Sequence, residues 1–265
     1  FIDKKSYPNE VVPVVYITNR VMANIANHEV GALATHLLKQ VQIMAKSGAF
    51  SFSELQIDCD WTETTRAKYF GLLMQLSSLA AANGINVSAT IRLHQVKYKQ
   101  ITGVPPVARG MLMFYNMGDL SEAADRNSIY NRHDANKYVG YLSSYPLPLD
   151  VALPIFSWAI QRRNGAIVQL LSSFTSADFE RLGFSRKDSG YYTATASFFY
   201  RGIYFKENDA IEIESITPKI ALEAATLLSK NLQHTDRSVA LFSLDSLNIA
   251  PYEKQNFKDI FNSFR

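Results

Sequence analysis

Apolar residues along the chain recur in two alternating patterns, one typical of buried strands and one typical of amphipathic helices. Short apolar runs predict strands over 11–17, 54–60, 85–93, 110–115, 149–156 and 238–244. Apolar residues at helical spacing predict helices over 28–46, 64–82, 135–144, 218–233 and 252–264. This alternation of strands and helices indicates an α/β protein with a parallel sheet.

The region 162–209 departs from this alternation. Gly165–Leu171 and Thr193–Tyr204 have the pattern of antiparallel strands, with a turn or short helix at 178–182 between them. We interpret the region as an α+β insertion into the parallel fold. The next run, 210–214, is either a seventh strand of the parallel sheet or lies outside it.

Polar residues stand where several predicted strands end. In a (β/α)8 barrel of the TIM type, such strand ends build the active face, and about 250 residues form the whole barrel. The 265 residues therefore favour one barrel domain over 1–265. Only six or seven strand–helix units are found, so the first strands are either absent or upstream of Phe1. The strand-end residues are Asn19, Asp58, Asp60, Arg92, His94, Asn116, Ser157, Trp158 and Asp245.

The segment Leu55–Trp61 contains two carboxylates, Asp58 and Asp60, at alternate positions of a predicted strand. Residues two apart share a face, so both carboxylates point toward the same side. Like charges this close require a function or a hydrogen-bond network. In the functional interpretation, the two carboxylates form part of the floor of a sugar-binding site. The structural alternative is that neighbouring groups such as Arg92 or Tyr115 bond to the pair.

Composition narrows the classes of function. The 27 basic and 24 acidic residues give a net charge of +3 without a basic run, so nucleic acid is not a predicted partner. Glycine-rich phosphate loops are absent from the sequence, and no His or Cys residues lie at metal-ligand spacing, so we predict neither a cofactor nor a metal. The single cysteine, Cys59, alternates away from the carboxylates and is predicted to be a buried structural thiol.

The sequence also bears on location. It contains no apolar stretch of about 18 residues, so no transmembrane helix is predicted. Because the chain begins at Phe1, we expect an exported protein whose signal peptide has been removed.

Three motifs, in their order along the chain, resemble the chitinase-like family 18 glycoside hydrolases. Residues 55–62 (LQIDCDWT) resemble that family's Asp-x-x-Asp-x-Asp-x-Glu signature, with Leu55 replacing its first Asp and Thr62 its final Glu. Residues 113–116 (MFYN) resemble the family's sixth-strand segment, and residues 153–156 (LPIF) resemble its seventh-strand segment. The resemblance extends from the third barrel strand to the eighth.

The resemblance implies a mechanism and shows where this chain departs from it. In that family the substrate's acetamido oxygen attacks the anomeric carbon while the Glu protonates the leaving oxygen. Threonine cannot donate that proton, a contribution of roughly 10²–10⁴-fold in rate. Asp58 and Asp60 would orient the substrate, and the acid would be either Glu63 or Glu214. The other expected substrate contacts are Tyr115, Asn116, Trp158, Arg92, His94 and Asp245.

Several of these residues could instead have a purely structural role. Glu63 alternates away from Asp60, and Glu214 could be a solvated residue. Trp158 could belong to the core, His94 could be structural and Asp245 could cap a helix. Three functions stay open: a hydrolase acting on an oligosaccharide or polysaccharide, a carbohydrate-binding barrel that has lost its acid, and a scaffold for protein contacts. The sugar, the linkage and the oligomeric state are undetermined.

Overall fold

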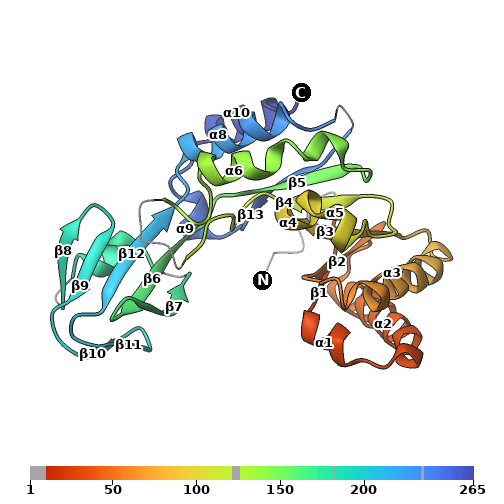
Figure 1. Cartoon of the computed structure of the whole chain (residues 1–265), viewed down its shortest axis with the longest axis horizontal. Coiled ribbons are helices and arrows are strands. Elements are labelled where there is room, and N and C mark those ends of the chain that lie inside the picture. Colours follow the sequence, from red (N-terminus) through yellow and green to blue (C-terminus); the bar gives the residue numbers. More distant parts are fainter. Residues whose placement is uncertain (1–9, 121–125, 173, 182, 234–235) are drawn as a thin grey trace. The chain divides into compact units, whose positions relative to one another are not determined.

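The computed structural model describes residues 10–120, 126–172, 174–181, 183–233 and 236–265, and it divides into two compact units. Unit 1 comprises Phe1–Met113, Tyr141–Val151 and Leu232–Ser238. Unit 2 comprises Phe114–Gly140, Ala152–Asn231 and Val239–Arg265. Figure 1 shows the course of the chain and the labels of its elements.

Unit 1 is built on four parallel strands in sequence order. The pairs β1–β2, β2–β3 and β3–β4 are all parallel, so the connections between them are crossovers that carry helices. The strands are β1 (Val14–Ile17), β2 (Glu54–Cys59), β3 (Asn86–Arg92) and β4 (Gly110–Met113).

Two long helices of unit 1 pack against each other, and α3 also contacts β3. The buried residues of α2 (Val30–Gly48) lie three or four apart, which places them on one face. The buried face of α3 (Arg66–Ala81) is made in the same way by Tyr69, Leu72, Leu73, Leu76 and Ala80. The short helical elements are α1 (Asn19–Asn24), η2 (Asn27–Glu29), α4 (Leu93–Lys97), α5 (Lys99–Thr102) and η3 (Leu142–Ser144).

Two further strands complete the parallel sheet, whose order is β1-β2-β3-β4-β5-β13. The unit boundary falls within β5 (Leu149–Pro154), and β13 (Val239–Phe242) belongs to unit 2. Backbone bonds from Gly110 to Pro148 in unit 1 and from Phe114 to Ala152 in unit 2 run in parallel register. The described part of the chain therefore has the six parallel strands that the sequence predicted, in the order of successive barrel strands.

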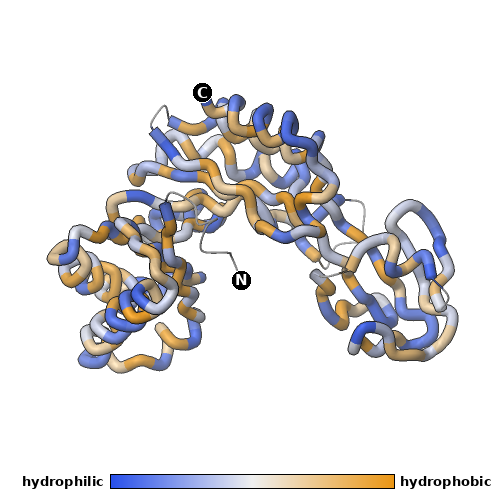
Figure 2. Tube along the Cα trace, turned by 180° about the vertical axis from the view of Figure 1, so that it is seen from behind, coloured by the Kyte–Doolittle hydropathy of each residue, from blue (hydrophilic) through white to orange (hydrophobic). Residues whose placement is uncertain are grey.

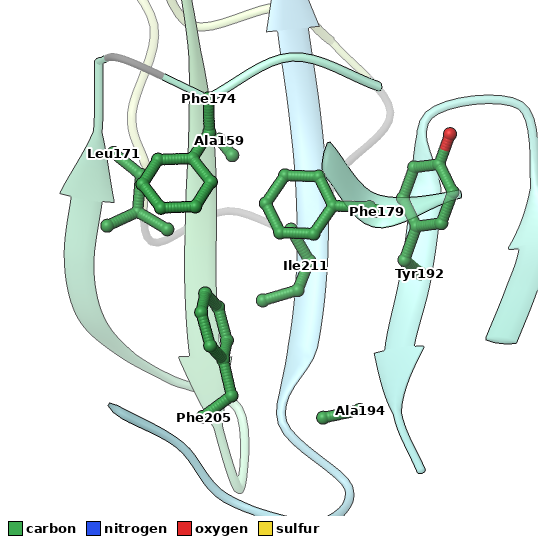
Figure 3. Packing of buried hydrophobic residues seen from close by; sticks show 8 residues of the cluster. All are labelled: Ala159, Leu171, Phe174, Phe179, Tyr192, Ala194, Phe205 and Ile211. Carbon is green, nitrogen blue, oxygen red and sulfur yellow. The ribbon is translucent and has the colours of Figure 1, made fainter. Parts of the chain in front are cut away.

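Unit 2 also contains an antiparallel five-stranded sheet with the order β7-β6-β12-β9-β8. One face of it is covered by an aromatic core around Phe174, Phe179 and Phe205 (Figure 3). The short helix α7 (Ser176–Phe179) and the hairpin of β10 (Phe198–Tyr200) and β11 (Ile203–Phe205) contribute to that core. The strands are β6 (Ser157–Arg163), β7 (Ala166–Leu171), β8 (Phe184–Asp188), β9 (Tyr191–Ala194) and β12 (Ala210–Ser215).

In unit 2, helix α8 packs against both α6 and α10. The Thr217 hydroxyl accepts a bond from the Ile220 N–H at the start of α8, where Pro218 occupies the first helical position. In Figure 2 these helices show both apolar and hydrophilic positions, as amphipathic helices do. Their bounds are α6 (Arg132–Val139), α8 (Pro218–Ser229) and α10 (Lys254–Asn262), and the short helix α9 (Ser246–Ile249) also belongs to unit 2.

The structure corrects three expectations about elements. The run 210–214 is not a seventh parallel strand, because β12 pairs antiparallel with β6 and β9. The antiparallel region begins at Ser157, where β6 directly follows β5, and not at 162. The segment 193–204 contains the end of β9 and two hairpin strands, since a turn interrupts it at Arg201–Gly202.

Candidate functional site

The two predicted carboxylates lie on one face of the parallel sheet in unit 1. Alternation along β2 places Asp58 on this face, with Asp60 directly after the strand, while Ile57 and Cys59 are fully buried on the other side. The Asp58 carboxylate accepts a 2.6 Å hydrogen bond from the Thr90 hydroxyl of β3. Strand register thus brings a hydroxyl donor beside the first carboxylate.

Arg92, at the end of β3, joins the two carboxylates. Its Nε donates to Asp60 at 2.5 Å, and its Nη2 lies 3.5 Å from Asp58. The guanidinium offsets the repulsion of the pair, as the structural alternative anticipated. The Asp60 side chain is nevertheless 48% exposed, so it can also accept a bond from a ligand.

An aromatic ring also lies beside this cluster. Tyr16 of β1 is the register partner of Asp58 and is 60% exposed. Aromatic faces and carboxylate acceptors suit the two sides of a sugar, its apolar C–H face and its hydroxyl groups. Sequence analysis missed Tyr16, although its place in the first predicted strand was a usable signal.

The residues that follow Trp61 do not supply a positioned acid. The Thr62 hydroxyl lies within hydrogen-bonding distance of the hydroxyls of Thr64 (3.0 Å) and Thr65 (3.3 Å), so it belongs to a threonine turn. Glu63 is exposed, and within the described residues no side-chain hydrogen bond or ion pair holds it. Trp61 itself is buried and donates its indole N–H to the Thr102 carbonyl, which confirms that it packs away from the carboxylates.

Two titratable groups near the carboxylates have shifted pKa values. Burial, together with the charges of Asp60 and Asp58, raises the pKa of Cys59 to about 12, so this thiol is not a nucleophile at neutral pH. Partial burial of the His94 imidazole lowers its pKa, with Arg92 acting in the same direction and Asp60 opposing. His94 is therefore mainly neutral at pH 7 and can accept or donate a hydrogen bond.

Unit 2 contains an open pocket of about 330 Å³. Three aromatic residues form part of its wall: Phe156, Trp158 and Phe242. The Phe156 ring lies edge-on to both Trp158 and Phe242, with centroids 5.5 and 5.8 Å away. The other lining residues are Asn116, Ser157, Ser172, Ser243, Asp245, Leu247 and Asn248.

The structure brings three predicted residues, Asn116, Trp158 and Asp245, into this pocket. A fourth, Tyr115, lies just behind it, because its ring stacks on Phe242 at 5.2 Å and 9°. Asp245 serves both of its proposed roles in part: it lines the pocket, and its side chain caps α9 by accepting from the Leu247 N–H. Sequence analysis missed Phe242, although it stands in the last predicted strand.

Glu214 is an anchor for the pocket wall. Its carboxylate accepts bonds from the Trp158 indole N–H (2.8 Å), the Ser128 N–H (2.8 Å) and the Ser128 hydroxyl (2.5 Å). Glu214 is buried, not solvated, and its oxygens are occupied by these donors. The arrangement fixes the indole ring of Trp158 in the pocket and leaves Glu214 poorly suited to donate a proton.

Other site types find less support. Within the described residues, no group of three or more His, Cys, Asp or Glu side chains is arranged to hold a metal ion. The helices that are described include none with the length and apolar character needed to cross a membrane.

Comparison with known proteins establishes the kind of fold. No family model matches the chain, and no curated protein matches it by sequence. Solved structures do match. A class V chitinase from Pseudomonas fluorescens matches with a TM-score of 0.56 at 13% identity, over 97% of this chain and 81% of that one. A chitinase from Chromobacterium violaceum matches with a TM-score of 0.54 at 13% identity, over 96% of this chain and 80% of that one.

The spore cortex-lytic enzyme SleL of Bacillus cereus matches with a TM-score of 0.54 at 13% identity, over 96% of this chain. The chain spans 60% of the length of that enzyme. At such identities the likeness establishes the fold alone. The chain therefore has a chitinase-like barrel fold, represented here by six parallel strands and an antiparallel insertion.

Proposed function

We propose that this protein binds an oligosaccharide or polysaccharide and does not cleave it by the chitinase-type reaction. The observation that carries the proposal is the pocket of unit 2, which combines aromatic walls with amide, hydroxyl and carboxylate groups. Aromatic faces bury the apolar face of a sugar ring, and the polar groups satisfy its hydroxyls. The chitinase-like fold supports the same class of ligand by analogy.

The absence of cleavage follows from the residues around the carboxylates of unit 1. By the resemblance of residues 55–62 to the family's signature, Thr62 stands in place of the acid, and its hydroxyl lies within hydrogen-bonding distance of its own turn. Asp60 is held in an ion pair with the Arg92 guanidinium. Asp58, Asp60 and Tyr16 would then contact a sugar without reacting with it. Because such glycans are met mainly outside the cytoplasm, we also propose that the protein is exported.

The first test measures binding in the pocket. Titration calorimetry with chitin oligosaccharides, soluble peptidoglycan fragments and β-glucan oligosaccharides should identify a ligand. Phe242→Ala should then weaken binding about tenfold, because it removes an exposed ring from the pocket wall. Phe199→Ala is the matched control, since Phe199 is 74% exposed and does not line the pocket.

The second test measures cleavage with the same glycans, as release of reducing ends. We expect none, both for the native chain and for Asp60→Asn. Cleavage by the native chain would overturn the proposal. If Asp60→Asn abolishes that cleavage and Glu63→Gln does not, the protein is a hydrolase whose acid is not Glu63. Failure of every glycan to bind would leave the protein-contact scaffold as the better hypothesis.

A further inference from the structure

A strip of aliphatic side chains runs along β7 of unit 2. Ile167, Val168 and Leu170 are 38%, 42% and 39% exposed, which is unusual for three apolar residues so close together. Ile167 and Leu170 are the register partners of Arg162 and Ile160 on β6. Val168 has no partner there, because a β-bulge inserts it between the paired residues.

The register places two of the three residues on one face of the sheet. Ile167 and Leu170 share that face because their partners Arg162 and Ile160 lie two residues apart on β6, and the exposed Val168 lies between them at the bulge. The opposite face is already occupied, since Leu171 is buried in the aromatic core. We call Ile167, Val168 and Leu170 the aliphatic strip.

The aliphatic strip begins beside the open pocket of unit 2. Trp158, which lines the pocket, lies two residues from Ile160 on β6 and therefore shares its face and that of Leu170. Ser172, another lining residue, directly follows β7. From Trp158 to Arg162 the strand spans about 13 Å, the length of four residues.

At the far end of the strip, the charged side chain of Arg162, the register partner of Ile167, is already held by other groups. The Arg162 guanidinium donates to the Leu120 carbonyl at 2.6 Å, and its Nε lies 3.7 Å from the Glu212 carboxylate. The strip itself carries no charge, and its side chains are aliphatic. Sugar rings are bound by aromatic faces, whereas branched aliphatic side chains suit an alkyl chain.

We propose that the ligand of the pocket is an amphiphilic glycoside, whose sugar occupies the pocket and whose alkyl or acyl chain lies on the aliphatic strip. This inference rests on the proposed function and adds the class of ligand. A docked protein strand fits the surface less well, because the bulge at Val168 interrupts the regular hydrogen-bonding edge that such a strand needs.

The experiment compares methyl and octyl β-glycosides, of glucose and of N-acetylglucosamine, below their micellar concentrations by titration calorimetry. The octyl compound of the preferred sugar should bind at least about tenfold more tightly, since each buried methylene adds affinity. Leu170→Asp should remove most of this difference and leave the methyl glycoside unaffected. Ser185→Asp is the matched control, because it adds the same charge to an exposed position of β8, the opposite edge strand.

The outcomes separate this inference from the proposed function. Equal affinities for the methyl and octyl compounds would overturn the inference and leave sugar binding in place. If neither the methyl nor the octyl glycosides bind, and no oligosaccharide binds either, both the inference and the proposed function are overturned. If the two affinities are equal, and light scattering shows a dimer that Leu170→Asp dissociates, the strip is a self-association surface and the inference is overturned.

Discussion

The residues around Asp58 show what alternation along a strand determines. Asp58 and Asp60 share a face while Cys59 and Trp61 are buried on the other side, as predicted. Arg92 was one of the partners considered for the pair, and its ion pairs confirm that choice. The Arg92 guanidinium offsets part of the repulsion between the two carboxylates.

The buried carboxylate of Asp209 was not anticipated from the sequence. Asp209 is fully buried and accepts hydrogen bonds from Gln161 Nε2, from Arg163 Nε and Nη2, and from the Lys206 N–H. Burial alone would raise its pKa, but these hydrogen bonds and the charge of Arg163 lower it. The ion pair links β6 to the start of β12.

Because the folded-state pKa of Asp209 is lowered, its stabilising effect is complete above the ordinary aspartate pKa of about 4 and is lost as pH falls below it. Asp209→Asn should therefore lower the free energy of unfolding by about 1–3 kcal/mol at pH 7 and by less near pH 3. Urea unfolding at both pH values checks this. A difference that stays constant with pH would show that the charge is not responsible.

At the scale of elements, sequence patterns predicted most strands and helices but not which strands pair with one another. The strand at 210–214 was expected as a possible seventh parallel strand, yet β12 lies in the middle of the antiparallel sheet. Its alternating pattern of Ile and Glu suits a strand of either kind. Pairing with β6 and β9 depends on residues far away in the sequence, which local periodicity does not contain.

Two glycines test how tightly unit 1 is packed. A Cβ at Gly110 of β4 would lie 2.6 Å from Ile91 Cγ1 and 3.1 Å from Leu147 Cδ2, whereas one at Gly71 of α3 would meet nothing within 4 Å. Gly110→Val should lower the free energy of unfolding by about 1–3 kcal/mol through overpacking. Gly71→Ala should raise it by about 0.5–1 kcal/mol through helix propensity. Denaturant midpoints measure both, and a neutral Gly110→Val would mean that Ile91 has room to move.

At the scale of the whole molecule, the chain has a chitinase-like fold, and the resemblance of residues 55–62 to the chitinase signature predicts that Thr62 replaces its Glu. Under the proposed function, the fold suggests testing carbohydrate ligands first. The two compact units share strand β5, whose first half belongs to unit 1 and whose second half belongs to unit 2.

This shared strand predicts that the units unfold together, because neither can lose its part of the sheet without disturbing β5. The chain's two tryptophans report on the units separately, Trp61 on unit 1 and Trp158 on unit 2. In Trp61→Phe and in Trp158→Phe, we expect tryptophan fluorescence and far-ultraviolet circular dichroism to give the same denaturation midpoint. Separate midpoints within either variant would show independent unfolding.

The sequence by itself determined the alternation of strands and helices, the six parallel strands and the common face of Asp58 and Asp60. These features depend on residues a few positions apart, so periodicity is sufficient to predict them. Only the tertiary structure decided that Glu214 anchors Trp158 and that Phe242 helps to wall the pocket. Glu214 reaches Ser128 across 86 residues of chain, and such long-range partners are selected by packing rather than by local pattern.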